Sequence, residues 1–387
     1  MPKIVIASDS FKGSLSSAEV AKAVESGILR AVADAETISF QVGDGGEGTS
    51  SILARHLGAK TIHTIVSDPI GRPVEASWYI HEDTAIMEMA AASGLTLLKS
   101  RELNPMRTST YGTGELIKAA TAKGCREFII GIGGSATNDG GTGMLEALGC
   151  RFLDINGEEI RHLCGGRLGD IYHIDPSGIL KTVKDSEFII ACDVDAPFIG
   201  PDGATRVFST QKGATQETMK TLEEGMTSLC KVINDEYGID LSATPGSGAA
   251  GGLGGAFLTF LNSKLVKGID LTLEISGFDK ALEDADLVIT GEGRIDSQSS
   301  KGKAISGVLA KASEKGVPVI AIAGSVLMSK EEIRLSGFIA VLPIGPTPQN
   351  ESDLEYAMRP EVASKRISDT VSKALVSLFP SWCHESL

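Results

Sequence analysis

Short apolar runs of the kind that form buried strands lie near both ends of the chain. They occupy residues 3–8, 36–42, 286–290, 317–323 and 338–343. Helical periodicity follows two of these runs, which predicts an amphipathic helix over 16–33, starting at Ser16 or Ser17, and another helix over 301–315. Apolar strands that alternate with helices are typical of a parallel sheet covered on both faces.

The middle of the chain shows a different pattern. Residues 60–89 contain three strand-like runs joined by turns, 151–160 predict a hairpin around Asn156-Gly157, and 187–193 predict a further strand. The run 125–132 fits either region. We therefore predict an α/β protein of two α/β domains. A flavodoxin-like parallel-sheet domain is built from residues 1–45 and 265–387, and a second α/β domain, residues 46–264, is inserted into it.

Composition narrows the classes of function. Hydrophobic residues make up 42% and charged residues 22% of the chain, as in a globular protein. The formal charge of −14 argues against nucleic acid and acidic membranes as partners, but a few cations in a cleft still bind small anions. No apolar run reaches the ~18 residues of a membrane helix, and the N-terminal run is too short for a signal peptide, so a cytoplasmic protein is expected. The six cysteines and six histidines lack the spacing of a zinc site.

Glycines are enriched and clustered. The chain has 45 glycines, roughly 12% against a usual ~7%. Two clusters, 43–51 (GDGGEGTSS) and 131–145 (GIGGSATNDGGTGML), lie between a predicted strand and a helix, where backbone N–H groups bind phosphate or carboxylate. The candidate ligand-binding residues of these loops are Asp44, Gly45, Gly46, Gly133, Gly134, Ser135, Asn138 and Asp139.

A third glycine cluster, 245–257, contains the pattern G-x-G-x-x-G at Gly246, Gly248 and Gly251. A dinucleotide-binding loop requires a buried strand directly before it, whereas residues 238–245 are polar and end in proline. The dinucleotide interpretation therefore fails. Two interpretations stay open: Gly248 and Gly251 present backbone donors to an anion, or the small residues allow close helix packing.

The loop 8–16 (SDSFKGSLS) follows the first predicted strand and leads into a helix. The ligand crevice of a parallel sheet lies at this position, at the carboxyl ends of the strands. Ser10 and Lys12 are its candidate binding residues, because a helix cap explains the serines but not the lysine.

The loop 290–304 (TGEGRIDSQSSKGKA) is predicted at the carboxyl end of the strand 286–290 and combines charges of both signs. Arg294 can form a forked contact with a carboxylate or phosphate. Asp296 can hold a metal ion or accept a proton, and Lys301 is a further candidate for anion binding.

Asp193 and Asp195 end the strand predicted over 187–192 and point the same way, because they are two residues apart. Together they can bind Mg²⁺, or one of them can act as a base toward a hydroxyl group. A turn role also fits Asp195, which leaves Asp193 as the stronger candidate.

The chain contains no Walker A motif, no kinase H-R-D or D-F-G set and no G-x-S-x-G elbow. The residues alone indicate an enzyme that acts on a small anion, with phosphate involved.

At these loops the chain resembles the type-1 (bacterial class I) glycerate kinases. The resemblance is carried, in order from residue 3 to about residue 303, by KIVIASDSFKGSLS, GDGGEGT, DPIGRPVEASW, MEMAAASGL, STYGTGELI, GIGGSATNDGGTGML, PGSGAAGGLGGAF and TGEGRIDSQSSKGK. Ser8 and Phe11 depart conservatively from the family pattern, which commonly has Pro and Tyr there.

The resemblance implies ATP-dependent phosphorylation of D-glycerate to 2-phosphoglycerate, with Mg²⁺, as a step of carbohydrate acid metabolism. It also implies a two-domain protein whose active site lies in the cleft between the domains. The expected partners are then D-glycerate and ATP, without nucleic acid or membrane, and a homo-oligomer is left open.

Within that implied reaction we assign roles as hypotheses. Asp193 is the base toward the attacking hydroxyl group, and Asp296 is the Mg²⁺ ligand. Lys12 and Arg294 are the cations for the glycerate carboxylate and the transferred phosphoryl group. The backbone N–H groups of the glycine loops 133–141 and 246–252 hold the nucleotide phosphates.

Three alternatives stay open. The first is a kinase for another small hydroxy acid, or one that forms 3-phosphoglycerate. The second is a nucleotide-independent phospho-sugar-acid isomerase or mutase. The third is a metabolite sensor without activity, against which the charged set of Lys12, Asp193, Arg294 and Asp296 argues.

Overall fold

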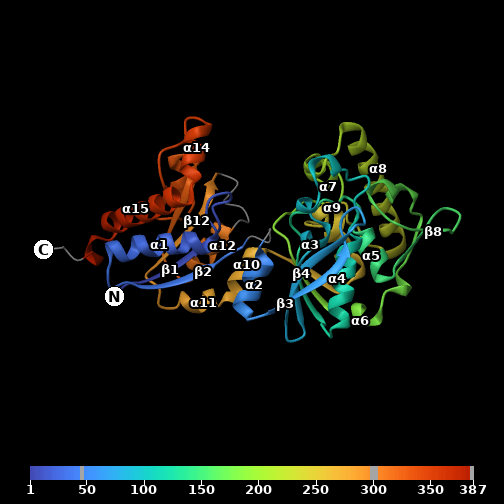
Figure 1. The fold of residues 1–387 in the computed structure, drawn as a ribbon, viewed down its shortest axis with the longest axis horizontal. Coiled ribbons are helices and arrows are strands. Elements are labelled where there is room, and N and C mark those ends of the chain that lie inside the picture. Colours follow the sequence, from blue (N-terminus) through green and yellow to red (C-terminus); the bar gives the residue numbers. More distant parts are fainter. Residues whose placement is uncertain (44–47, 297–303, 384–387) are drawn as a thin grey trace. The chain divides into compact units, whose positions relative to one another are not determined.

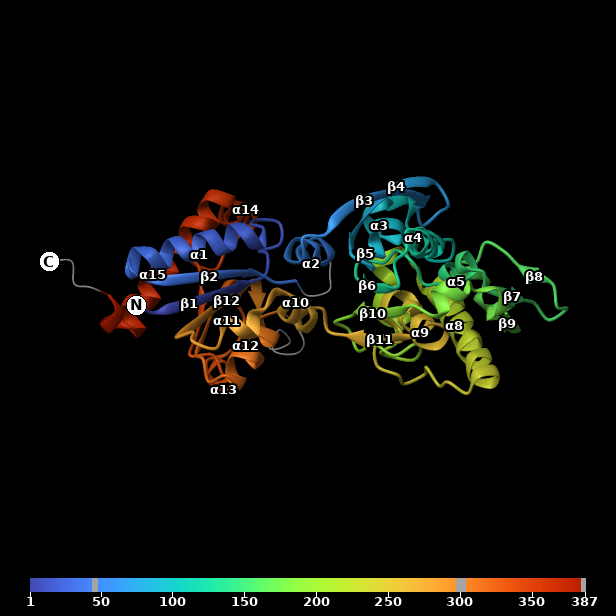
Figure 2. The same ribbon diagram turned by 90° about the horizontal axis from the view of Figure 1, so that it is seen from below.

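A computed structural model describes residues 1–43, 48–296 and 304–383 of the chain. The chain forms two compact units (Figures 1 and 2). Unit 1 comprises Met1–Asp44 and Ile269–Leu387, and unit 2 comprises Gly45–Gly268. In the described part of the chain, no helix has both the length and the apolar composition that crossing a membrane requires.

Unit 1 holds a parallel sheet of five strands in the order β14-β13-β12-β1-β2. The strands are β1 (Lys3–Ser8), β2 (Glu36–Gln41), β12 (Leu287–Ile295), β13 (Val319–Val326) and β14 (Ala340–Pro343). Counted along unit 1, this is the order 2-1-3-4-5, which is the strand order of flavodoxin. The flavodoxin-like parallel sheet predicted from the apolar runs is confirmed.

Helices cover both faces of this sheet. They are α1 (Ser17–Ala31), α10 (Gly268–Ser276), α11 (Phe278–Ala281), α12 (Ala304–Glu314), α13 (Lys330–Leu335), α14 (Glu351–Met358) and α15 (Pro360–Leu378). Because side chains alternate along a strand, Ile4 and Ile6 pack against α1 and α15, whereas Val5 and Ala7 pack against α10, α11 and α12. Helices α1 and α15 lie side by side (Figure 1), and Gly27 allows their close contact, since a Cβ there would lie 2.6 Å from the Ser368 carbonyl oxygen.

Unit 2 is built on a mixed sheet in the order β11-β10-β6-β5-β4-β3. Its strands are β3 (Lys60–Ser67), β4 (Pro73–His81), β5 (Thr84–Glu88), β6 (Glu127–Gly131), β10 (Glu187–Ala191) and β11 (Ser263–Val266). The pairs β3–β4 and β4–β5 are antiparallel, and the remaining pairs are parallel. A small sheet of β7 (Arg151–Leu153), β8 (Glu159–Ile160) and β9 (His173–Asp175) accompanies it.

One large apolar core fills unit 2, with Trp78, Phe128, Phe188 and Phe257 fully buried. The helices around it are α2 (Thr49–Leu57), α3 (Ala90–Ser93), α4 (Tyr111–Ala122), α5 (Thr142–Leu148), α6 (Lys181–Lys184), α7 (Ala204–Phe208), α8 (Gln216–Tyr237) and α9 (Ala249–Phe260). The three strands predicted over 60–89 and the hairpin around Asn156-Gly157 are confirmed. The run 125–132 supplies β6 of this unit.

The loop predicted to begin at residue 290 is wrong over its first residues, because β12 continues to Ile295. Its last residues pair with β13 alone, with Arg294 opposite Ser325 and Ile295 opposite Val326. Backbone pairing with β13 on one side is enough to keep this glycine-rich, charged segment in a strand conformation. Its polarity made it resemble a loop.

Candidate functional site

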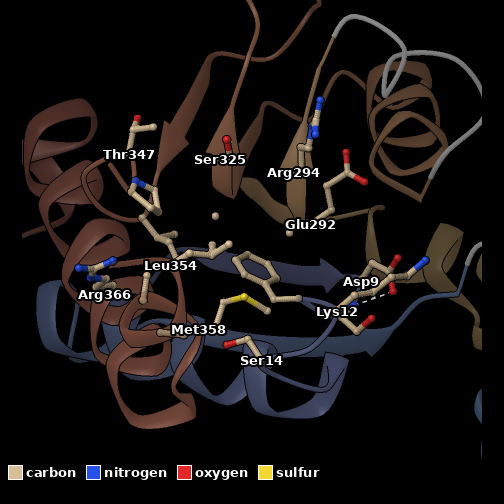
Figure 3. A pocket seen from close by; sticks show the side chains of 18 of the residues that line it. Asp9, Lys12, Ser14, Glu292, Arg294, Ser325, Thr347, Leu354, Met358 and Arg366 are labelled. Atoms are coloured by element: carbon tan, nitrogen blue, oxygen red, sulfur yellow. Dashed lines mark hydrogen bonds between the residues drawn. The ribbon is translucent and has the colours of Figure 1, made fainter. Parts of the chain in front are cut away.

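The carboxyl edge of the unit 1 sheet carries a cavity of about 610 Å³. The last residues of β12 and β13 and the residues that follow β1 and β14 line it, together with α14 and α15 (Figure 3). It lies where β1 and β12 are neighbours, with the helix after β1 on one face and the helix after β12 on the other. Such a change of direction opens a ligand crevice in parallel α/β sheets.

Part of the cavity wall is apolar. Its side chains are Phe11, Ile344, Pro346, Leu354 and Met358. Figure 3 shows Leu354 and Met358 pointing toward the middle of the space. Leu354 is 47% exposed, although it lies inside a hollow where a ligand could cover it. Exposed apolar surface in a concave site of this size is typical of small-molecule pockets.

The charged part of the wall begins directly after β1. The N–H of Asp9 donates to the carbonyl oxygen of Gly291 (3.0 Å), and Asp9 Oδ1 accepts from the N–H of Ser10 (2.6 Å). Phe11 and Leu15 then close a tight turn, in which the Phe11 N–H donates to the Leu15 carbonyl oxygen (2.8 Å). This turn places Lys12 on the exposed rim of the cavity.

Ser16 caps α1 and receives the N–H of Glu19, which completes a capping box. The helix therefore begins where the sequence predicted. Ser14, between the turn and the cap, lines the cavity, and its buried hydroxyl has no hydrogen-bond partner among the described residues.

The end of β12 supplies the other charges. Glu292 and Arg294 lie on the same face of the strand because they are two residues apart. Glu292 is 9% exposed, whereas the Arg294 side chain is 65% exposed, and Arg294 Nε lies 3.5 Å from Asp296 Oδ2. In Figure 3 both side chains extend from β12 on the side of the cavity where Asp9 and Lys12 also lie.

The cavity thus brings together three residues predicted from the sequence: Ser10, Lys12 and Arg294. Asp296 joins them through its contact with Arg294. Sequence reasoning missed Arg366 of α15 and Leu354 and Met358 of α14, because these residues lie in ordinary helices far along the chain from the glycine-rich loops. The candidates Asp44, Gly45, Gly46 and Lys301 lie outside the described residues.

In unit 2, the glycine-rich loop 131–145 links β6 to α5. Backbone hydrogen bonds join its first half to the segment 93–95. The N–H of Ala136 donates to the carbonyl oxygen of Ser93 (2.9 Å), and the N–H of Leu95 donates to that of Gly134 (2.9 Å). Gly134 is exposed and Gly133 is half-buried, while Ser135 is buried. The accessible part of this loop is therefore short.

Asp139 has no exposed surface. Its Oδ2 accepts from the N–H (2.7 Å) and hydroxyl (2.8 Å) of Thr110 and from the N–H of Gly143 (3.3 Å), and its Oδ1 accepts from the N–H of Gly141 (3.2 Å). Burial raises the pKa of this carboxyl group, and the hydrogen bonds oppose the rise. Asp139 braces the loop against the start of α4, which is a structural role.

Asn138 is also fully buried and donates to the hydroxyl of Thr205 (3.2 Å). Its amide oxygen and the Thr137 hydroxyl have no hydrogen-bond partner among the described residues. Buried polar atoms of this kind are uncommon, so this part of the loop differs from an ordinary tight turn.

Lys212 is a residue that sequence reasoning missed. It is 1% exposed, and its Nζ donates to Ser135 Oγ (2.7 Å) and to the carbonyl oxygen of Thr137 (2.6 Å). Burial lowers the pKa of this lysine to about 7, and the charge of Asp139 opposes that shift. These two hydrogen bonds fix the shape of the glycine-rich loop, and Lys212 adds positive charge to it only at a pH below about 7.

Gly248 and Gly251 lie at the start of α9, and both are explained by packing. A Cβ at Gly248 would lie 2.0 Å from the Pro197 carbonyl oxygen, and one at Gly251 would lie 2.1 Å from that of Thr137. Ala250, Gly251 and Gly252 have positive φ, which forms a left-handed turn against loop 131–145. Of the two interpretations left open, the structure supports close packing.

Asp193 follows β10 and is half-buried, while Asp195 is exposed. Asp193 Oδ1 accepts from the N–H of Gly268 (3.0 Å), the first residue of α10. This bond gives Asp193 a structural function at a helix start. It leaves the residue at the carboxyl end of a parallel strand, where a base can meet substrate.

The described residues contain no group of three or more His, Cys, Asp or Glu side chains arranged to hold a metal ion. Mg²⁺ in phosphoryl-transfer sites is commonly bound by one or two carboxylates together with substrate phosphates. Asp9, Glu292 and Asp296 supply carboxylates at the sheet edge of unit 1, so the donor types present fit a metal ion that arrives with a nucleotide.

The comparisons with known proteins agree on one family. A sequence profile of the glycerate kinase family matches residues 4–376. The chain is 46% identical over 346 residues to a glycerate kinase of Bacillus subtilis, a match that covers 89% of this chain and 90% of the relative. It is 45% identical over 345 residues to the glycerate 2-kinase of Escherichia coli K12, with 88% and 90% covered.

The fold comparison points the same way. A crystal structure from Salmonella typhimurium LT2 that was assigned as glycerate kinase 2 superposes with a TM-score of 0.84 at 40% identity, covering 98% of this chain and 99% of that one. The chain belongs to the glycerate kinase family. It is therefore an enzyme, a kinase, as the resemblance implied.

Proposed function

We propose that this enzyme phosphorylates D-glycerate with ATP and forms 2-phosphoglycerate. One observation carries the proposal. This chain belongs to the glycerate kinase family, is 45% identical to a glycerate 2-kinase, and has two cationic side chains in the cavity at the carboxyl edge of its flavodoxin-like sheet. Lys12 and Arg294 are the cations, and both reactants are anions.

Phosphoryl transfer needs positioning and charge neutralisation more than covalent chemistry. Lys12 and Arg294 provide charge for the phosphoryl group, and Arg294 also has the planar geometry for a forked contact with its oxygens. A bound Mg²⁺ would neutralise phosphate charge, with Asp296 as our proposed ligand for it. Asp193 is our proposed base toward the attacking hydroxyl group.

The loop 131–145 is the proposed site for a small anion in unit 2. Support comes from its accessible glycines, Gly133 and Gly134, and from the Nζ of Lys212, which donates to Ser135 Oγ. Gly251 packs directly against Thr137 and Asn138 of this loop and stabilises it, whereas Gly248 packs against Pro197.

The test is ³¹P NMR of the purified protein with Mg-ATP and D-glycerate. A 2-phosphoglycerate resonance and ADP are expected. A 3-phosphoglycerate resonance would keep the kinase and overturn the choice of hydroxyl group. Intact ATP without a new ester would reject D-glycerate as the acceptor, and a panel of small hydroxy acids would then identify another.

A further inference from the structure

The cavity of unit 1 is poorly matched to glycerate. Every carbon of glycerate carries oxygen, so the acid has no apolar surface for Phe11, Leu354 and Met358 to cover. A space of about 610 Å³ also falls in the range of ~300–1,000 Å³ that holds drug-sized ligands. The cavity therefore fits a larger ligand with an apolar part and an anionic part.

The arrangement of the wall fits these two parts. Figure 3 shows Leu354 and Met358 in the middle of the space, with Asp9, Lys12, Glu292 and Arg294 grouped on one side. A planar, weakly polar ring would pack on the apolar side chains and remove them from water. A chain of negatively charged groups attached to that ring would then extend toward Lys12 and Arg294.

The cavity wall also contains side chains that can donate hydrogen bonds. Ser14, Ser325 and Thr347 present hydroxyl groups to the cavity, and the buried hydroxyl of Ser14 has no partner among the described residues. Arg366 lies on the side opposite Arg294 in Figure 3 and packs against the backbone of Gly345. Its guanidinium group can donate to the ring nitrogens of a base.

The position in the sheet supports the same ligand class. The cavity lies beside the neighbouring strands β1 and β12, whose following helices pass to opposite faces. In flavodoxin, which has this strand order, that point binds FMN, a phosphorylated cofactor with a flat ring. Fold position and wall chemistry are independent observations, and both indicate a nucleotide.

We propose that this cavity is the nucleotide site of the enzyme, with the base against Phe11, Leu354 and Met358 and the phosphates beside Lys12 and Arg294. The assignment rests on the proposed kinase function. It removes the nucleotide from the glycine-rich loop 131–145, where the sequence placed its phosphates, and leaves that loop for the smaller anion.

Leu354→Asp tests the apolar wall in the full-length enzyme. Leu354 is 47% exposed on α14, so the substitution should leave the fold intact. The matched control is Leu335→Asp on α13, at a leucine 71% exposed and outside the cavity wall. Calorimetric titration with Mg²⁺ and the ATP analogue AMP-PNP needs no turnover, and it measures nucleotide affinity directly.

We expect Leu354→Asp to weaken AMP-PNP binding and to raise KM for ATP roughly tenfold or more, with KM for D-glycerate within about twofold of the wild type. Leu335→Asp should change neither constant. Equal AMP-PNP affinity in Leu354→Asp and the wild type would overturn the assignment. So would a rise in KM for D-glycerate alone.

Adenosine and inorganic tripolyphosphate, used as competitors of AMP-PNP, separate the two ends of the site. Leu354→Asp should weaken adenosine and spare tripolyphosphate, whereas Arg294→Gln should do the reverse. Unchanged competition in both variants would refute the proposed orientation. A protein that binds AMP-PNP here but forms no phosphoglycerate would keep the nucleotide site and refute the acceptor. If Leu354→Asp leaves turnover of D-glycerate with ATP unchanged, the acceptor is kept and the nucleotide site is refuted.

Discussion

The N–H of Gly140 donates to the carbonyl oxygen of Gly251 across 2.9 Å. This bond joins two glycine-rich segments more than a hundred residues apart in the sequence. Gly251 has a φ of +70°, and its α-carbon faces the backbone of Thr137 and Asn138. Backbones in such direct contact leave no room for side chains, which explains much of the glycine enrichment in unit 2.

Gly251→Ala should therefore be strongly destabilising. The new Cβ would lie 2.1 Å from the Thr137 carbonyl oxygen, at a φ that L-residues avoid. We expect the free energy of unfolding to fall by about 3 kcal/mol or more. Urea denaturation followed by circular dichroism measures the change.

Gly238→Ala provides the matched control. Gly238 ends α8 with a φ of +68°, but nothing lies within 4 Å of a Cβ added there. Gly238→Ala should lower the free energy of unfolding by only about 1 kcal/mol, because only the backbone conformation is unfavourable for alanine. Similar losses in the two variants would show that the contact with Thr137 is not what requires Gly251.

Lys212 makes stability depend on pH. Burial lowers its pKa from 10.5 to about 7, so between these values the unfolded chain binds a proton that the folded chain has released. The free energy of unfolding therefore rises with pH in this window. Below pH 7 the full penalty of burying the charge is present.

Lys212→Met should remove that dependence. Relative to the variant, the wild type should gain about 2 kcal/mol between pH 7 and pH 9, since one pKa unit is worth about 1.4 kcal/mol. Thermal and urea denaturation at several pH values provide the measurement. Lys231→Met, at an exposed position of α8, is the control and should follow the wild type. A constant difference between Lys212→Met and the wild type would contradict the low pKa.

Arg294→Gln should reduce kcat/KM about a hundredfold, because it removes a cation from the anion-binding edge of unit 1. The side chain is 65% exposed, so stability should stay within about 0.5 kcal/mol of the wild type. Arg334→Gln is the control: Arg334 is 71% exposed, pairs with Glu331 and lies outside the cavity wall. If both variants keep normal kinetics, Arg294 does not contact the reactants.

The sequence alone predicted most of the elements that frame the sites. Local patterns of neighbouring residues determine the apolar strands of unit 1 and the capping box at Ser16 and Glu19, so both can be predicted from the sequence. The end of β12 could not be predicted from the sequence, because its strand conformation comes from pairing with β13.

Long-range burial explains the other differences. Lys212 lies in a polar stretch, and the partners of its buried Nζ, Ser135 and Thr137, lie more than 70 residues earlier in the sequence. The sequence pattern around Asp139 is typical of an anion site, but Thr110, 29 residues earlier, donates two hydrogen bonds to its carboxylate. Glycine clusters indicate close backbone approach, but the sequence cannot say whether a ligand or another segment approaches.

Asp193 has two possible functions, and a pair of substitutions separates them. Its Oδ1 accepts from the N–H of Gly268 at the start of α10, and it is also our proposed base. Asn keeps an oxygen acceptor but cannot take a proton, whereas Ala removes both properties. If Asp193 is the base, Asp193→Asn and Asp193→Ala should both lower kcat by about 10²-fold or more.

Stability distinguishes the capping role from the catalytic one. Asp193→Ala should lower the free energy of unfolding by about 1 kcal/mol, and Asp193→Asn should lower it less, because the bond to Gly268 survives. Steady-state kinetics and urea denaturation of both variants provide the comparison. Near-normal kcat in Asp193→Asn, with reduced stability in Asp193→Ala, would leave Asp193 as a helix cap and require another base.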